Sequence, residues 1–231
     1  MTNAKPSRKR RTIAIAVVVL FVGVGWFVAW PAFQRRMAIQ EIERIGGWVE
    51  QESVGPWWLN RWLGQWGIGV DSVDINVVYF EDSEVTVDEL RQLSRLSDFK
   101  DLTLAGTQIN NDGLKRLCGR LTNLEGLDVS RTNISDDGLK HLSGIATLKW
   151  LWLDDTHVSD DGMKHLRKLT NLQGLGLDGT RVSDEGLKHL SSLSDIQILV
   201  LNDTDVGDNG LKHLGKLTNL TDLYLEVLHR F

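Results

Sequence analysis

Residues Leu124–Thr147 read LEGLDVSRTNISDDGLKHLSGIAT, and this 24-residue unit returns almost unchanged through the second half of the chain. A fixed period of this length predicts a solenoid, in which each copy buries its apolar face only against its neighbours. Residues 99–123 fit the unit with one inserted residue near Cys118, and residues 75–98 keep only its apolar positions. The regular copies begin at Leu124, Leu148, Leu172, Ile196 and Leu220, and the last of them stops after its strand.

Within one copy, two periodicities follow each other. Leucines alternate with Trp150 and Trp152 in the stretch LKWLWL from Leu148, which is the pattern of a half-buried strand. A polar turn leads to Ser159-Asp160-Asp161-Gly162, where serine and aspartate suit a helix N-terminus. The next apolar residues lie three apart and so share one helical face. Each copy is therefore predicted to be a strand, a turn and a short helix.

The motif LxxLxLxxTxVSDxGLKHL resembles the leucine-rich repeat, in a 24-residue bacterial form with threonine where asparagine or cysteine is usual. This resemblance covers roughly residues 75–225. It implies an α/β horseshoe, with a parallel sheet on the concave side and helices on the convex side. We expect the threonines to form a ladder of hydrogen bonds between the turns of neighbouring repeats. They are Thr107, Thr132, Thr156, Thr180 and Thr204.

The positions that point outward from the strands vary between copies, whereas the leucines do not, and such variation is where specificity is normally placed. Trp150 and Trp152 are predicted to form an apolar platform, flanked by glycines that leave room and bordered by carboxylates. The alternative is that the indoles fold over Gly174 and Gly176 and fill that gap themselves. The predicted ligand-binding residues are Trp150, Trp152, Asp128, Asp154, Asp178, Ile198, Val200 and Tyr224.

The N-terminal region predicts a membrane anchor. No charge occurs between Arg11 and Arg35, and an apolar helix over residues 12–33 would be long enough to cross the hydrocarbon core. Five basic residues precede this stretch and two follow it, which points the N-terminus to the cytoplasm and the repeats outside it. A cleaved signal peptide is the alternative, although the apolar stretch is longer than a signal h-region. The whole chain thus resembles bacterial membrane-anchored leucine-rich repeat proteins.

The predicted domains are a basic tail at residues 1–11, the span at 12–33, a juxtamembrane cap at 34–74 and the repeats at 75–231. A short helix is expected over residues 34–45, with Gly46 and Gly47 ending it. The segment after these glycines is rich in tryptophan. It is predicted to cap the open end of the solenoid, or else to lie on the membrane surface. These tryptophans are Trp48, Trp57, Trp58, Trp62 and Trp66.

Composition and motifs argue against several functions. The chain has a net charge of -5, and beyond residue 36 it holds 19 basic against 31 acidic residues, so nucleic acid is not expected as a partner. The recurring aspartate pairs are read as helix caps rather than calcium ligands, and Cys118 has no nucleophile motif around it. We expect no enzyme activity, metal or cofactor. Solvent-exposed positions are expected for the four histidines that recur one per repeat: His141, His165, His189 and His213.

The sequence therefore favours a membrane-anchored protein that binds a protein, peptide or glycan ligand on its concave face. Two alternatives stay open, a passive structural or assembly component of the cell envelope and an accessory subunit of a membrane enzyme. The final copy has no room for its helix, so its strand is expected either to pair with a second copy of the chain or to be covered by residues 227–231.

Overall fold

The computed structural model describes residues 36–53, 73–86, 89–90, 99–119, 121 and 123–226. The chain divides into two compact units, residues 1–38 with 52–74, and residues 39–51 with 75–231. In the first unit, the described residues are only the start of a helix and the ends of two strands. The second unit holds the repeats.

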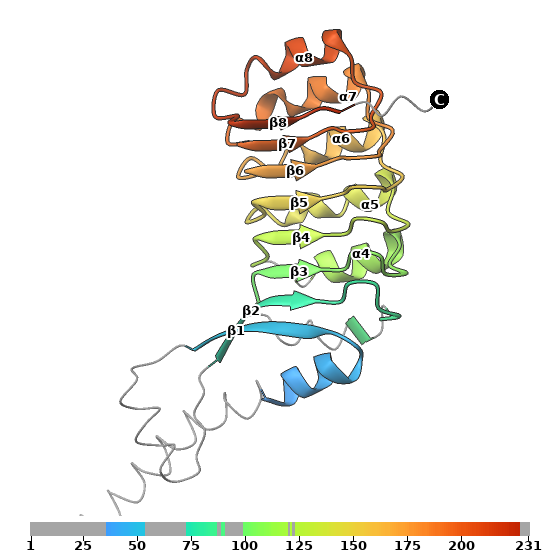
Figure 1. The fold of residues 1–231 in the computed structure, drawn as a ribbon, viewed down its shortest axis with the longest axis vertical. Helices are drawn as coiled ribbons and strands as arrows, with labels where there is room; N and C mark the ends of the chain where they lie inside the picture. Colours follow the sequence, from blue (N-terminus) through green and yellow to red (C-terminus); the bar gives the residue numbers. More distant parts are fainter. Residues whose placement is uncertain are drawn as a thin grey trace, which may run out of the picture. The chain divides into compact units, whose positions relative to one another are not determined.

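The second unit repeats a strand and a helix along its length (Figure 1). The strands are β1 (Trp48–Ser53), β2 (Val73–Tyr79), β3 (Asp101–Thr103), β4 (Gly126–Asp128), β5 (Trp150–Trp152), β6 (Gly174–Gly176), β7 (Ile198–Val200) and β8 (Asp222–Tyr224). The α-helices are α4 (Asn111–Cys118), α5 (Asp136–Leu139), α6 (Asp160–Leu166), α7 (Asp184–Leu187) and α8 (Asp208–Leu214). Two 3-10 turns, η1 (Leu142–Gly144) and η2 (Lys188–Ser192), come after α5 and α7.

The strands form one sheet in chain order, from β1 to β8, and each pair from β2 to β8 is parallel. The helices lie on one face of this sheet (Figure 1). Sequential parallel strands joined by helices on a single side are the arrangement of a leucine-rich repeat solenoid. This topology confirms the predicted leucine-rich repeat solenoid, whereas the membrane span predicted to precede it lies outside the described residues.

The core lies between the sheet and the helices. Leu148, Leu151 and Leu153 of the β5 repeat are fully buried, whereas Trp150 and Trp152 between them are partly exposed. Met163 and Leu166 of α6 are also fully buried, as the three-residue spacing predicted. Equivalent apolar side chains are buried in each repeat from β3 to β7, so the buried apolar layer continues from one repeat to the next.

The repeated threonines act within a repeat and not between repeats, so the predicted ladder is wrong. The Thr156 hydroxyl donates to the carbonyl oxygen of Leu153, three residues earlier in the same turn, at 2.6 Å. Thr107, Thr132, Thr180 and Thr204 make the same bond to Leu104, Val129, Leu177 and Leu201, at 2.5–2.7 Å. The hydroxyl is buried, and its bond satisfies a carbonyl that leaves the strand ladder at the turn.

The links between helices come instead from the first acidic residue of each pair. A carboxylate oxygen of Asp160 accepts from the backbone N–H of Ser183 in the next repeat, at 2.8 Å, and the other accepts from the Ser183 hydroxyl at 2.7 Å. Asp136 holds Ser159 with the same two contacts. We expected these aspartates to cap their own helices. They hold the N-terminal residue of the following helix and so join consecutive repeats.

These carboxylates also explain the glycine of the SDxG motif. A Cβ placed on Gly186 would lie 2.5 Å from Oδ1 of Asp160, and one placed on Gly162 would lie 2.4 Å from Oδ1 of Asp136. Both distances are well below van der Waals contact. Glycine is therefore required where the carboxylate of the preceding repeat reaches across to the next helix.

Asp160 and its neighbour Asp161 give a matched test of this link. Asp161 is exposed and pairs with Lys164 on the same helix. We expect Asp160→Ala to lower the free energy of unfolding by about 1 to 3 kcal/mol, since two hydrogen bonds to a charged acceptor are lost. Asp161→Ala should cost less than about 1 kcal/mol, as for an exposed ion pair. Equal losses of unfolding free energy for the two variants, measured by chemical denaturation, would contradict the role of Asp160 in joining repeats.

Upstream of the repeats, residues 36–44 are helical, as predicted, and Gly46 lies in the left-handed region at φ +85°. The predicted membrane span, residues 12–33, and every cap tryptophan except Trp48 lie outside the described residues. In the part of the chain that the structure describes, no helix is long and apolar enough to cross a membrane.

Candidate functional site

The outward positions of the strands form straight rows across the sheet, as predicted. Gly126, Trp150 and Gly174 are aligned partners on β4, β5 and β6. Asp128, Trp152 and Gly176 form the adjacent row on the same strands. The row of Asp154 and Asp178 continues beyond the strands, because the backbone N–H of Asp155 donates to the carbonyl of Asp178 at 2.7 Å. We call the surface made by these rows the outer sheet face.

The two indoles lie over the glycines of the next strand. A Cβ on Gly174 would lie 2.3 Å from Cε3 of Trp150, and one on Gly176 would lie 2.4 Å from Cε3 of Trp152. The glycines therefore leave room for the indoles themselves and not for a ligand beside them. This packing fixes both rings against the sheet, while each remains partly exposed.

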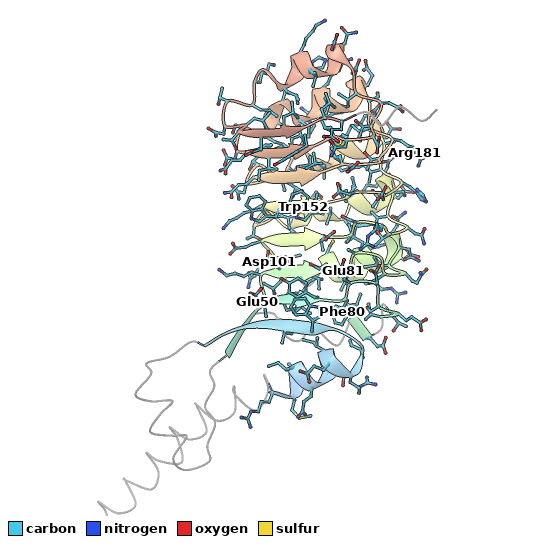
Figure 2. All side chains as sticks on the ribbon, in the orientation of Figure 1. Glu50, Phe80, Glu81, Asp101, Trp152 and Arg181 are labelled. Carbon is cyan, nitrogen blue, oxygen red and sulfur yellow. The ribbon has the colours of Figure 1, made fainter. Side chains whose placement is uncertain are left out.

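Open space lies on the other side of the indoles, above β3 and β4. A hollow of about 250 Å³ is found there, and we call it the sheet hollow. Thr103, Gly126 and Asp128 lie between Tyr79 at one end and the two tryptophans at the other. Figure 2 labels Asp101 and Trp152 along the strand side of the stack, where this hollow is found. Its full lining is Val77, Tyr79, Asp101, Leu102, Thr103, Gly126, Leu127, Asp128, Trp150 and Trp152.

The wall opposite the tryptophans is also aromatic. The Tyr79 ring stacks on the indole of Trp48, with ring centroids 3.8 Å apart and planes within 6°. The Tyr79 hydroxyl donates to the Glu50 carboxylate at 3.3 Å. Burial and the Glu50 charge raise the pKa of Tyr79, so the phenol stays protonated at neutral pH. Trp48 and Glu50 thus hold Tyr79 in place as a fixed side of the hollow.

Two carboxylates of the outer sheet face, Asp101 and Asp154, lie in an unfavourable environment for charge. Burial, and then repulsion from Glu125, raises the pKa of Asp101, while Lys100 and Lys149 partly offset these effects. Burial raises the pKa of Asp154 to about 6, with Asp178 and Asp128 adding repulsion and the backbone N–H of Asp178 opposing it. Such shifts occur where desolvation and like charges meet, and they are typical of functional sites.

The structure brings together only some of the predicted binding residues. Trp150, Trp152 and Asp128 line the sheet hollow. Asp154 lies beside Trp152, since both would contact a Cβ on Gly176, and Asp178 lies one repeat later. Farther along the sheet, on strands that do not border the hollow, are Ile198, Val200 and Tyr224.

Tyr79, Asp101 and Thr103 belong to the hollow but were absent from the predicted set. Their outward positions could be predicted from the sequence, because they share rows with the two tryptophans. Their grouping around one hollow could not be predicted, because the strand pattern does not say toward which neighbouring strand an indole leans. The carboxylate of Asp101 occupies the space over Gly126, so the glycine on that side of Trp150 gave no signal of the direction.

The four recurring histidines lie on or beside the helices, and they are partly buried rather than fully exposed as expected: His141, His165, His189 and His213. Burial, and after it the charges of Arg167 and Lys164, lowers the pKa of His189. Across the described ranges, no group of three or more histidine, cysteine or acidic side chains is arranged to hold a metal ion. Cys118 is buried in the core, and this raises the pKa of its thiol to about 12.

Comparison with known proteins gives fold-level likenesses only. No family model matches the chain, and no curated protein matches it. Among solved structures, internalin C2 of Listeria monocytogenes is similar at 21% identity and a TM-score of 0.49, over 65% of this chain and 80% of that one. A second internalin of the same species, internalin F, is similar at 19% identity and a TM-score of 0.38, over 58% of this chain and 50% of that one.

Proposed function

We propose that this protein is a non-enzymatic, membrane-anchored leucine-rich repeat protein that binds a protein, peptide or glycan partner on its outer sheet face. One observation carries the proposal: the sheet hollow, in which Tyr79, Trp150 and Trp152 are held in place around a floor of small and acidic side chains. Fixed aromatic side chains lose little conformational freedom on binding, and they are typical of interface hot spots.

The partner role is tested by affinity capture from a detergent extract of native membranes. The full-length chain should retain a partner that the double variant Trp150→Ala with Trp152→Ala does not retain. His165→Ala, on the helix side, serves as the control and should behave like the wild type. If all three chains retain the same proteins, or if none retains any, the protein is instead a passive or accessory component.

The anchor proposal rests on the uncharged stretch at residues 12–33 and its basic N-terminal flank. Protease added to intact cells or spheroplasts is expected to remove the repeat domain, because the repeats would lie outside the cytoplasm. Immunoblotting with antibodies to the repeats and to the N-terminal tail measures this. A protected repeat domain, or a soluble form with a new N-terminus near Trp26, would contradict the proposed topology.

The last strand supports a further proposal, association of two copies through the C-terminal edge. All three residues of β8 are exposed, with Leu223 at 41% and Tyr224 at 52%, unlike the buried leucine of every inner strand from β3 to β7. An exposed apolar edge strand is a template for pairing. Sedimentation velocity of the full-length chain in neutral detergent should then show a dimer, and Tyr224→Glu should weaken it. A monomer at every accessible concentration would exclude this association.

A further inference from the structure

The outer sheet face is acidic along its whole length. Its three outward rows contain no lysine or arginine at any described position. The nearest bases are already paired at its margin. Lys100 and Lys149 bind Glu125 at 3.1 and 2.7 Å, and Arg131 binds Glu81 at 2.9 Å. The acidic residues of the rows are Glu81, Asp101, Asp128, Asp154, Asp178, Asp222 and Glu226.

Two of these carboxylates, Asp101 and Asp128, line the sheet hollow itself. Within the described part of the chain, neither forms an ion pair with a base. Asp128 accepts one hydrogen bond, from the backbone N–H of Ser130 at 2.9 Å, through Oδ1 alone. The hollow thus presents two carboxylates that form no ion pair with a base. Lys100 and Lys149, both bound to Glu125, offset only part of the burial and repulsion that raise the pKa of Asp101.

The walls of the hollow add to the attraction for positive charge. Tyr79, Trp150 and Trp152 line it, and the face of an aromatic ring attracts a cation, most strongly for tryptophan. Because Trp48 stacks on Tyr79 and the indoles pack on glycines, these rings need not reorganise when a ligand enters. A neutral ligand would leave both carboxylates without an ion-pair partner in a less hydrated site, whereas a cation would pair with them.

The size of the hollow limits what enters it. At about 250 Å³ it is smaller than the usual range for a whole small-molecule ligand, roughly 300 to 1,000 Å³. It suits one long side chain, while the rest of a partner lies along the acidic rows that continue toward Asp154 and Asp178. An extended polypeptide with further basic residues matches this surface in charge.

We propose that the sheet hollow receives an arginine or lysine side chain from an extended, basic segment of a partner protein, held between the aromatic walls and the carboxylates of Asp101 and Asp128. This inference rests on the proposed partner-binding function and narrows the partner to a basic polypeptide. A guanidinium group suits the site best, since it stacks on aromatic rings and donates to carboxylates at the same time.

The test uses the full-length chain in a neutral detergent and a short synthetic peptide of alternating arginine and serine. A matched peptide carries citrulline in place of arginine, which keeps the planar shape but removes the charge. Isothermal titration calorimetry should show the arginine peptide binding at least about 10-fold more tightly than the citrulline peptide. Equal binding of the two peptides, or no binding of either, would overturn the inference.

Two double variants test whether the selectivity for the arginine peptide comes from the sheet hollow. The double variant Asp101→Asn with Asp128→Asn keeps the size of both side chains. It should lower the affinity for the arginine peptide by at least about 10-fold. The matched control, Asp137→Asn with Asp161→Asn, removes the same charge from exposed helix positions and should change binding less than about 2-fold. Similar losses from both pairs would mean that only the net charge of the chain matters, which also overturns the inference.

The outcome is separable from that of the proposed function. One outcome is that capture of the partner requires Trp150 and Trp152 and yet is unchanged by the double asparagine variant. That result would support the proposed partner binding and overturn the inference that a cationic side chain occupies the hollow. If the arginine peptide binds selectively while no tryptophan-dependent partner is captured, the chemistry of the hollow stands and the proposed partner role does not.

Discussion

Replacing Leu175 with alanine is expected to lower the free energy of unfolding by about 2 to 5 kcal/mol, because apolar area is lost and a cavity remains. Leu175 is fully buried in β6, an inner strand of the sheet, and its strand partners are Leu151 and Leu199. Each repeat is stable only through its neighbours, so a defect at this place weakens the contacts on both sides of it.

His165→Ala is the control for this measurement, since His165 lies on the helix side and is partly exposed. We expect it to cost less than about 0.5 kcal/mol. Urea denaturation monitored by circular dichroism measures both variants. Similar losses from the two would mean that the strand register is not what holds the stack together.

The double variant Trp150→Ala with Trp152→Ala is expected to lose at least about 30-fold in affinity for the captured partner. Truncation of a hot-spot residue costs about 2 kcal/mol or more, and this converts to that factor. The variant removes one wall of the sheet hollow but leaves the leucine core intact. Surface plasmon resonance with the immobilised full-length chain measures the affinity.

Stability has to be measured on the same variant, because the indoles also pack on Gly174 and Gly176. We expect a moderate loss of about 1 to 2 kcal/mol in the free energy of unfolding, within the usual range for a partly buried side chain. A larger loss of stability with unchanged affinity would instead identify the tryptophans as scaffold residues that fill the space over the glycines.

The repeat register could be predicted from the sequence because the physics behind it is periodic. Alternating leucines define which side of each strand is buried, so the partners Gly126, Trp150 and Gly174 are found by counting. The same holds for the helix face of Met163 and Leu166. These features depend on backbone period and burial alone.

The features that the sequence did not reveal depend on side-chain direction. Trp150 has a glycine on both sides, Gly126 and Gly174, and the pattern gives no reason for the indole to lean toward one of them. The same limit applies to Asp160, which was expected to cap its own helix and instead reaches the next one. Rotamers and contacts across repeats decide both cases, and the period of the sequence specifies neither.

The chain's one cysteine allows ligand binding in the sheet hollow to be tested by thiol labelling. Cys118 is buried and its thiol pKa is raised to about 12, so it should not react with maleimide at neutral pH. Thr103→Cys places a reactive thiol in the hollow, and Lys168→Cys places one at an exposed position on the helix side. Bound partner should strongly slow maleimide labelling at position 103 and leave the rate at position 168 unchanged. An unchanged rate at position 103 with the partner bound would contradict binding in the sheet hollow.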